Sequence, residues 1–409
     1  MLRRISVTNC KSLRNVKVKF PRLAVLFGPN AAGKSNFIDA LQILSRLVSC
    51  RTLSEALSGP VRGYPLESFA FPGGGLASLL NSESSAFSIE AETDTGKERY
   101  LYRVTVRIQP GSGILSVGDE YLAVVTENGE VKGSPLIEKK GDQLCIRRGS
   151  KPALTEPVGL DHTILSDSHF SGAKYRHIEL CRSEISGWRT YYLDPRIAMR
   201  QPGPPSDIRD IGVSGRGIAP FLFRLKAENP GHFAALLRTL RSLIPGVECL
   251  DVELDKKRGL LDISIRQDGT DFSSRIISDG TLRVLGLCAV AVNPLSDSLI
   301  GFEEPENGVH PGRLELIADL LSSLAISQKR QVIVTTHSPL LCDAVLRKHR
   351  SDPGNVALLR VGQERDGTRI VPIDTTSPLF QDNEIRQAMT SGSEEGIFGE
   401  LLMRGLIDG

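Results

Sequence analysis

A glycine-rich stretch near the N-terminus has the residue types and spacing of a phosphate-binding loop. The segment GPNAAGKS, residues 28–35, matches the pattern G-x-x-x-x-G-K-[ST] at every fixed position. Glycines permit a tight turn, and consecutive backbone N–H groups at a helix N-terminus bind phosphate. We expect Lys34 to reach the β- and γ-phosphates and the Ser35 hydroxyl to ligate Mg²⁺. The predicted nucleotide-binding residues are Gly28, Pro29, Asn30, Ala31, Ala32, Gly33, Lys34, Ser35 and Asn36.

A second stretch, GFEEPENGVHP (residues 301–311), places several carboxylates directly after an apolar run. Crowded carboxylates need a positive partner, and Mg²⁺·ATP would supply one. We expect Glu303 to hold Mg²⁺ through water, in the place that aspartate usually fills, and Glu304 to act as general base on the attacking water. Glu306 and Asn307 are interpreted as caps or partner contacts, and His310-Pro311 is predicted to start the following helix. For Glu306 and His310 a capping or structural role is favoured.

Two further motifs complete the set. VIVTTHSP (332–339) puts His337 at the end of a buried strand, where ligands of open α/β sheets bind, so His337 is predicted to sense the γ-phosphate. A lone histidine in such a place is otherwise a structural residue. SDGTLRVLGL (278–287) opens an apolar helix, and Ser278 is either its N-cap or part of a signature loop. In the second case Ser278, Asp279 and Gly280 face the γ-phosphate of ATP bound to another subunit.

The elements that position these motifs alternate between strands and helices. A short apolar run, LAVLFG (23–28), leads into the phosphate loop, and a helical pattern at 35–49 follows it, which makes a chance glycine-rich turn the poorer explanation. Alternating residues from 86 to 126 predict an antiparallel meander, and residues 51–82 look loop-like. We therefore predict an α/β fold with a mixed central sheet, an antiparallel β-subdomain and a helical and β insertion. The predicted divisions are 1–126, 127–215 and 216–409.

Composition excludes several other classes of protein. The 409 residues carry 50 basic and 48 acidic side chains, so a nucleic-acid-binding face would have to be local. No run of about 18 apolar residues predicts a membrane span, and no secretory signal is recognised at the N-terminus. The seven scattered cysteines include no CxxC pair, which argues against a zinc site and favours a reducing, cytoplasmic location.

With these four motifs in this order, the chain resembles the ABC-type ATPases of the SMC/RecF-like group. It is most similar to the stand-alone bacterial AAA family ATP-binding proteins related to the ATPase part of OLD-family nucleases. The stretches that carry the resemblance are RRISVTNCKSL, GPNAAGKSN, IPGVECLDVE, SDGTLRVLGL, EEPENGVHP and TTHSP. The resemblance implies the P-loop NTPase fold of ABC-ATPase type, ATP hydrolysis with Mg²⁺, and a homodimer that sandwiches two ATP molecules head to tail. Only 72 residues follow His337, too few for a Toprim nuclease domain, so any nuclease is expected as a separate effector.

Three functions remain open on the sequence. The first is an ATP-hydrolysing switch that dimerises on ATP and acts on nucleic acid or an effector, in DNA repair or phage defence. The second is the nucleotide-binding subunit of a transporter, against which stands the long interval between residues 30 and 278. The third is a slow, ATP-binding scaffold.

Basic and acidic clusters elsewhere have simpler interpretations. The candidate DNA contacts are short and lack interleaved aromatic residues, so a solvated face is the favoured reading: residues 147–151, 255–259 and 346–350. The acidic residues Glu394, Glu395 and Glu400 are read as a helix N-terminus, with Ser391 or Ser393 as its cap, rather than as a metal cluster.

Overall fold

The computed structural model describes residues 1–148, 151–295, 298–373 and 397–399. The chain divides into two compact units, which are described one at a time. Unit 1 comprises residues 1–22, 28–189 and 359–373, and unit 2 comprises 23–27, 190–358 and the C-terminal residues from 374. The predicted cap and acidic cluster at residues 391–395 and 400 lie outside the described residues.

Unit 1 is built on an eight-stranded antiparallel sheet in the order β2-β1-β4-β5-β6-β7-β8-β9. Its strands are β1 (Leu2–Cys10), β2 (Leu13–Lys19), β4 (Ser85–Asp94), β5 (Arg99–Gln109), β6 (Ile114–Val125), β7 (Ile137–Lys140), β8 (Gln143–Arg148) and β9 (Lys151–Pro157). Strands β4 to β6 are the predicted meander, with Ala91 opposite Tyr102 and Tyr102 opposite Leu122. The alternation of β5 buries every second side chain, including Tyr100, Tyr102 and Val104, and leaves the others partly exposed.

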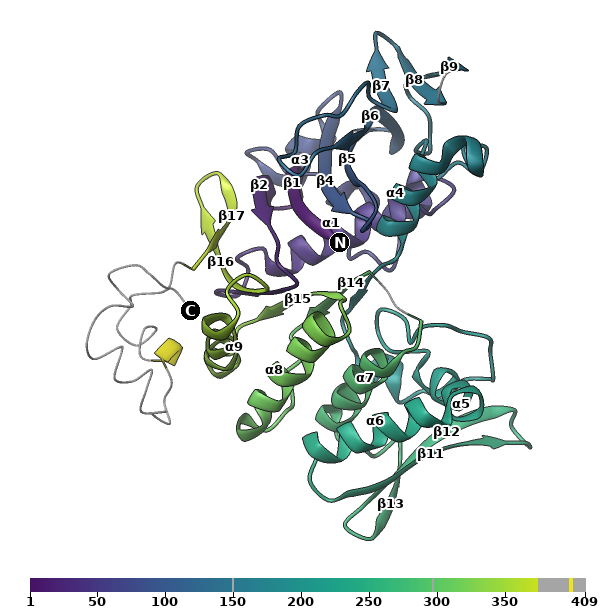
Figure 1. Ribbon diagram of the computed structural model, residues 1–409, viewed down its shortest axis with the longest axis vertical. Coiled ribbons are helices and arrows are strands. Elements are labelled where there is room, and N and C mark those ends of the chain that lie inside the picture. The colour runs from purple at the N-terminus through teal and green to yellow at the C-terminus, as the bar shows by residue number, and fades with distance from the viewer. Residues whose placement is uncertain (149–150, 296–297, 374–396, 400–409) are drawn as a thin grey trace. The chain divides into compact units, whose positions relative to one another are not determined.

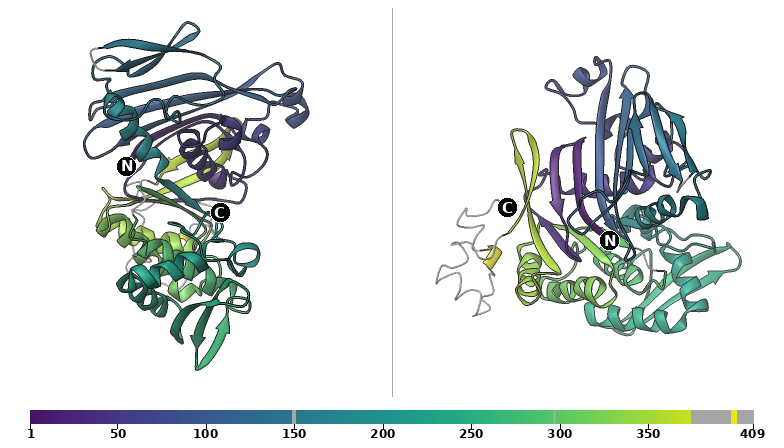
Figure 2. Two further views of the ribbon diagram at one scale, coloured as in Figure 1. Left: turned by 90° about the vertical axis from the view of Figure 1, so that its right-hand side faces the viewer. Right: turned by 45° about the horizontal axis from the view of Figure 1, so that its top comes forward.

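Helices and helical turns accompany this sheet (Figures 1 and 2). They are α1 (Lys34–Leu47), α2 (Leu53–Leu57), η1 (Pro65–Ser68), α3 (Gly75–Leu80), η2 (Ala173–Tyr175) and α4 (Arg176–Ser186). Helix α2 contacts β6, α4 contacts β4, and α1 packs against both of these helices. The amphipathic pattern of α1 buries Phe37, Leu41 and Leu44. Residues 51–82 are more structured than their loop-like sequence indicates, because local caps stabilise short helices there. The Thr52 hydroxyl, for example, accepts the Glu55 N–H at 3.2 Å at the start of α2.

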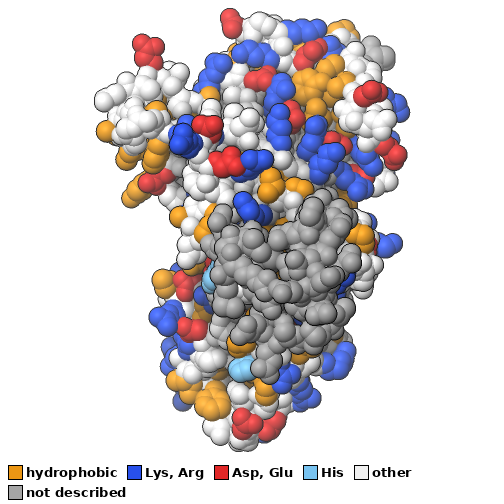
Figure 3. Space-filling model, turned by 90° about the vertical axis from the view of Figure 1, so that its left-hand side faces the viewer, with side chains coloured by type: hydrophobic (Ala, Val, Ile, Leu, Met, Phe, Trp, Pro, Cys, Tyr) orange, Lys and Arg blue, Asp and Glu red, His pale blue; other side chains and the backbone are white. Residues whose placement is uncertain are grey.

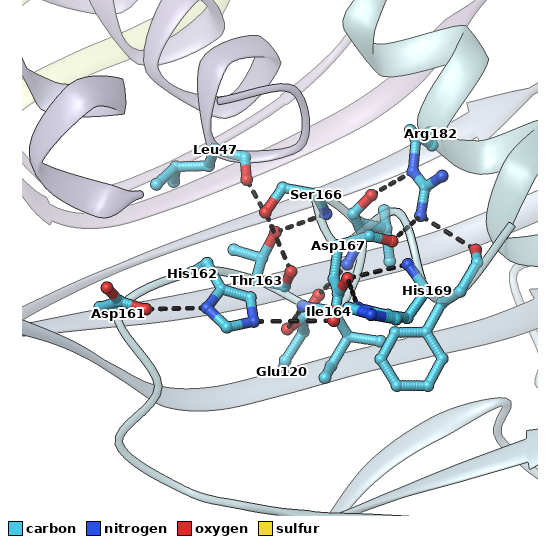
Figure 4. Close-up of polar contacts among 12 residues, drawn as sticks. Leu47, Glu120, Asp161, His162, Thr163, Ile164, Ser166, Asp167, His169 and Arg182 are labelled. Carbon is cyan, nitrogen blue, oxygen red and sulfur yellow. Dashed lines mark hydrogen bonds and ion pairs between the residues drawn. The ribbon is translucent and has the colours of Figure 1, made fainter. Parts of the chain in front are cut away.

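The segment between β9 and α4 is held by polar contacts instead of regular secondary structure (Figure 4). The Glu120 carboxylate of β6 accepts the N–H of Ile164 at 2.7 Å, and the Thr163 hydroxyl donates to the Leu47 carbonyl at 2.7 Å. The Arg182 guanidinium of α4 donates to three backbone carbonyls of the same segment. This part of the predicted insertion is therefore tied to the sheet and to α1 by specific hydrogen bonds.

Unit 2 contains a mainly parallel sheet in the order β10-β14-β15-β3-β16. Strands β10 and β16 are divided between the units, and only their residues 190–191 and 356–358 belong to unit 2. The strands are β3 (Leu23–Phe27), β10 (Trp188–Tyr191), β14 (Leu299–Glu303), β15 (Gln331–Thr336) and β16 (Val356–Glu364). Strands β14, β15 and β3 run parallel, with Phe302 opposite Val334 and Val334 opposite Val25. Every residue of these three strands is buried, as the continuous apolar runs predicted. In unit 1, the rest of β16 forms a hairpin with β17 (Gly367–Pro372).

The remaining elements of unit 2 are helices and a small antiparallel sheet. The sheet has the order β11-β12-β13 and consists of β11 (Val247–Asp255), β12 (Leu260–Gln267) and β13 (Thr270–Ser273). The helices are η3 (Pro195–Met199), α5 (Ile218–Glu228), α6 (Pro230–Leu243), α7 (Asp279–Val292), η4 (Pro311–Arg313), α8 (Leu314–Ser322), η5 (Ser323–Ser327) and α9 (Pro339–Ser351). Helices α5 and α6 lie against β11 and β12, and α7 lies beside α6 (Figure 1).

None of the helices in the described part of the chain combines the length and apolar character that a bilayer crossing requires.

Candidate functional site

The phosphate loop of unit 1 has a backbone that only glycine fits at two positions. Gly28 has φ +152°, and a Cβ atom there would lie 2.1 Å from the Val361 carbonyl oxygen. Gly33 has φ +103°, and its Cβ would lie 2.1 Å from the Thr368 hydroxyl oxygen. The loop therefore packs directly against the β16–β17 hairpin, and side chains are excluded where it turns into α1.

The Lys34 side chain curls over this loop. It is 6% exposed, and its ammonium donates to the carbonyl oxygens of Gly28 at 2.7 Å and Pro29 at 2.9 Å. Lys34 opens α1, so the positive end of the helix dipole and its N-terminal N–H groups lie at the same place. A buried ammonium, a helix N-terminus and a turn with glycine at both ends together fit the triphosphate of a nucleotide. The Ser35 hydroxyl beside them is half-buried and could ligate a metal ion.

A pocket of about 660 Å³ adjoins the first turn of α1. The Asn36 amide donates to the Ser12 hydroxyl at 2.8 Å, and Asp39 accepts from Lys11 at 2.5 Å and from Arg62 at 3.2 Å. All five residues line the pocket. Sequence reasoning did not single out Lys11, Ser12 or Arg62, because they lie in the β1–β2 turn and in a stretch read as a loop.

The acidic loop of unit 2 brings several polar side chains of the candidate site into contact. Glu304 follows β14 with φ +46°, a left-handed conformation that turns its side chain away from the direction of the strand. Its N–H donates to the Thr335 carbonyl at 2.9 Å, so the turn is tied to β15. Its carboxylate lies 3.0 Å from Nδ1 of His337 and accepts from Nδ2 of Asn307 at 2.6 Å. Two side chains, one from the same loop and one from the TTHSP motif, thus converge on the Glu304 carboxylate.

The other two glutamates of the cluster lie in different surroundings. Glu303 is 6% exposed and forms the end of β14, opposite Thr335. Glu306 is also 6% exposed and accepts the Thr336 hydroxyl. Burial raises the pKa of Glu306, and the nearby Glu304 charge raises it further, against the effect of the Thr336 hydrogen bond.

The Thr336 hydroxyl in turn accepts the Ser338 N–H at 2.9 Å. Glu306 is therefore bonded to the residue before His337 and, through it, linked to the residue after His337. His310 accepts the Gly312 N–H at 3.2 Å and caps η4, which agrees with the helix start predicted there.

The predicted signature turn lies at the N-terminus of α7. Ser278 caps the helix, because its hydroxyl accepts the Thr281 N–H at 3.1 Å. Asp279 is bound by two arginines, and their hydrogen bonds lower the pKa of its carboxyl. At Gly280 an added Cβ would lie 1.9 Å from the Gly308 carbonyl oxygen, so the signature turn touches the end of the acidic loop backbone to backbone. Sequence reasoning missed this contact because 28 positions separate the two glycines.

The structure thus groups the predicted residues by unit. Unit 2 brings Glu304, Asn307 and His337 together, and it places Gly280 against the acidic loop, whereas the phosphate loop from Gly28 onward belongs to unit 1. Strands β14, β15 and β3 are parallel neighbours, so their carboxyl ends share one edge of the sheet. That edge of the unit 2 sheet, where Glu303 ends β14 and Thr336 ends β15, is where open α/β sheets bind ligands.

Comparison with known proteins identifies the family. The family described as "AAA domain, putative AbiEii toxin, Type IV TA system" matches residues 23–343, which is most of the chain. The chain belongs to this family. It carries the AAA domain that this family description names, and its fold is that of SMC heads, the fold that the four motifs predicted. No curated protein matches the chain.

Two solved structures show the same fold. One is the SMC head bound to the C-terminal winged-helix domain of ScpA, at 14% identity and a TM-score of 0.54, covering 91% of this chain and 98% of that one. The other is an SMC head with an extended coiled coil bound to the C-terminal domain of ScpA, from Pyrococcus furiosus. It has 11% identity and a TM-score of 0.51, covering 94% and 99%. The predicted fold, a mixed sheet with helices and an antiparallel subdomain, is confirmed.

Proposed function

We propose that this protein binds and hydrolyses ATP, with Mg²⁺ as its metal ion. The observation that carries this proposal is the Glu304 carboxylate, which His337 and Asn307 orient at the carboxyl end of a buried parallel strand. A carboxylate held in this way takes a proton from water as the water oxygen attacks the γ-phosphorus, and the bond to the bridging oxygen breaks. Lys34 and the N–H groups of the phosphate loop offset the charge of the phosphates, and Ser35 and Glu303 hold the metal ion.

The pocket beside α1 suits the nucleoside part of ATP. It adjoins Asn36, two residues after Lys34, so it continues from the phosphate loop without a gap in the chain. Its hydrogen-bonding side chains and the rings of Phe69 and Phe71 offer polar and apolar contacts to a ribose and a base.

We further propose that two copies of the chain bind two ATP molecules head to tail. Ser278, Gly280 and the N-terminus of α7 would face the γ-phosphate held by the second copy. The contact between Gly280 and Gly308 supports this arrangement, because it links the signature turn to the loop that carries Glu304. The family description, which names a putative toxin of a toxin–antitoxin system, supports a role in phage defence through a separate effector such as a nuclease.

Direct action on DNA is the weaker extension of this proposal. Residues 255–259 form the exposed β11–β12 turn, and residues 346–350 end α9, where Arg347 pairs with Glu315 at 3.3 Å and Lys348 pairs with Asp319. Residues 149 and 150 of the third candidate lie outside the described part. On the face drawn in Figure 3, Lys and Arg side chains are interspersed with Asp and Glu side chains. Such a mixed face favours a protein effector over a phosphate backbone.

The test compares ATP turnover by the wild type, Glu304→Gln and a matched control, with oligomeric state measured by light scattering. We expect Glu304→Gln to abolish turnover and trap an ATP-dependent dimer, because it keeps the shape of the side chain and removes the base. Glu253→Gln, an exposed substitution on β11, should behave as wild type. Duplex DNA in parallel reactions shows whether nucleic acid stimulates turnover.

If the wild type binds ATP but neither it nor Glu304→Gln turns ATP over, the result would contradict hydrolysis and indicate a scaffold. Turnover by a protein that stays monomeric with ATP would contradict the head-to-tail dimer.

A further inference from the structure

Two arginines from η3 and its C-terminus converge on the signature turn. Nε of Arg196 donates to Oδ2 of Asp279 at 2.8 Å, and Nη2 of Arg200 donates to Oδ1 of the same carboxylate at 2.6 Å. All three residues belong to unit 2, and η3 packs against α7. The signature turn is therefore built from two segments about 80 residues apart in the chain.

The two arginines differ in what else they do. Arg200 has 22% of its side chain exposed and also donates to the carbonyl oxygens of Ser274 at 3.3 Å and Arg275 at 2.7 Å. These hydrogen bonds of Arg200 hold the segment that precedes the turn. Arg196 has 84% of its side chain exposed, and its Nε donates to Asp279, while the charge of Asp194 also acts on it. Within the described residues, the two terminal nitrogens of its guanidinium form no hydrogen bond.

The charges at this turn suit an approaching triphosphate. A lone Asp279 would repel phosphate at the place where Ser278 and Gly280 are proposed to receive it. Arg196 and Arg200 together balance the charges of Asp279 and of Asp194, which also acts on Arg196, so the positive end of the α7 dipole remains beside the turn. The planar guanidinium presents paired donors that match phosphate oxygens better than an ammonium does.

The turn is also flanked by apolar side chains that a partner would cover. Ile197, the neighbour of Arg196, is 65% exposed, and Ile276, two residues before Ser278, is 68% exposed. Exposed β-branched residues of this size on both sides of a polar motif are typical of a surface that a second protein surface buries.

We infer that Arg196 is a catalytic arginine that acts in trans. Its guanidinium contacts the γ-phosphate of the ATP held by the phosphate loop of a second copy, while Arg200 keeps Asp279 and the turn in place. In hydrolysis the water oxygen bonds to the γ-phosphorus, the bond to the β–γ bridging oxygen breaks, and Glu304 of the copy that holds the ATP takes the proton. Arg196 stabilises the charge on the phosphoryl oxygens and exchanges no proton. This inference rests on the proposed ATPase function and head-to-tail dimer.

The test is complementation between two inactive variants. Arg196→Ala alone should hydrolyse ATP about 10³-fold more slowly than wild type, as removal of such an arginine does elsewhere. Arg196→Lys should recover only part of the rate, because an ammonium lacks the paired donors. The matched control is Arg266→Ala, which removes another exposed arginine paired with an aspartate, Asp271, in unit 2. The control should hydrolyse ATP at the wild-type rate.

Arg196→Ala is then mixed one to one with Glu304→Gln before ATP is added. In a mixed dimer, one site combines the intact Glu304 of the first variant with the intact Arg196 of the second. Half of randomly formed dimers are mixed and each has one competent site, so the first turnover should release about a quarter of the wild-type phosphate, at the wild-type rate.

Three outcomes would overturn the inference. Wild-type turnover by Arg196→Ala would show that the arginine is not needed. A mixture that dimerises on ATP but stays inactive would show that Arg196 acts within its own subunit. Absence of turnover in both the wild type and Arg266→Ala would overturn the proposed ATPase function itself. The other two outcomes require an active wild type, so the two kinds of failure are distinguishable.

Discussion

The stability of unit 1 should depend on the protonation of Glu120, a carboxyl group in β6 with no solvent exposure. Oε1 accepts the Tyr102 hydroxyl at 2.9 Å and the Leu165 N–H at 3.1 Å. Oε2 accepts the Ile164 N–H at 2.7 Å (Figure 4). Burial nevertheless outweighs these three hydrogen bonds and raises the pKa of Glu120 from 4.5 to about 7. The folded protein therefore keeps a proton that the unfolded chain releases.

This bound proton determines whether a rise in pH stabilises or destabilises the folded protein. Because the folded-state pKa lies above the unfolded one, the contribution of Glu120 to stability is complete below pH 4.5 and is lost as the pH rises through 7. The difference between pKa values of 7 and 4.5 corresponds to about 3 kcal/mol at roughly 1.4 kcal/mol for each pH unit. Most of this, about 2 to 3 kcal/mol, is lost between pH 5 and pH 8.

Urea unfolding at these two pH values measures the effect. Trp188, the one tryptophan of the chain, is 2% exposed, so its fluorescence changes when the structure around it unfolds. We expect the wild type to lose about 2 to 3 kcal/mol more unfolding free energy than Glu120→Gln between pH 5 and pH 8, because glutamine does not titrate. Other titrating groups contribute equally to both proteins and cancel. Glu130→Gln, at an exposed position in the turn after β6, should keep the wild-type pH dependence. Equal pH dependence in the wild type and Glu120→Gln would refute the reasoning.

Three further predictions concern backbone and capping contacts. Gly33→Ala should weaken ATP binding more than about tenfold in calorimetry, because its Cβ would lie 2.1 Å from a threonine hydroxyl at φ +103°; unchanged affinity would contradict the tight loop. Gly308→Ala, whose Cβ would lie 2.8 Å from Cα of Gly280 at φ +82°, should lower the turnover rate while ATP still binds, and a normal rate in steady-state assays would argue against coupling of the two loops. Asp343→Ala should lower the unfolding free energy of unit 2 by roughly 1 kcal/mol or more, because Oδ1 accepts two backbone N–H groups of residues 397–398 at 3.0 Å. Asp343→Asn keeps an acceptor and should lose less; equal losses in chemical denaturation would contradict the capping role.

Sequence periodicity predicted most of the elements that position the site. The buried strand at 23–27, the helix that follows the phosphate loop and the strand that ends at Glu303 all appear as expected, because apolar runs and helical spacing reflect burial directly. The meander is also confirmed. The short helices in residues 51–82 were missed because capping side chains, and not an apolar period, determine them.

The contacts of the signature turn could not be predicted from the sequence. Arg196 and Arg200 lie in a stretch with no recognisable motif, and only the folding of η3 onto α7 brings them to Asp279. The same holds for Gly308, whose positive φ and contact with Gly280 depend on the path of the acidic loop. A local pattern can name such residues as candidates, but their partners are set by tertiary packing.

The crowded glutamates of the acidic loop illustrate how packing resolves an apparent conflict in the sequence. Glu303 ends β14 and stays buried in the sheet, whereas the left-handed turn at Glu304 and the following proline send the next two carboxylates in different directions. Glu304 meets the imidazole of His337 and an amide, and Glu306 accepts a hydroxyl from the strand beside it. Burial raises the pKa of Glu306, whose carboxylate accepts the Thr336 hydroxyl, whereas the Glu304 carboxylate lies against His337 and Asn307. The spacing E-E-P-E therefore gives Glu304 and Glu306 separate partners, and only Glu304 meets the histidine of the predicted switch motif.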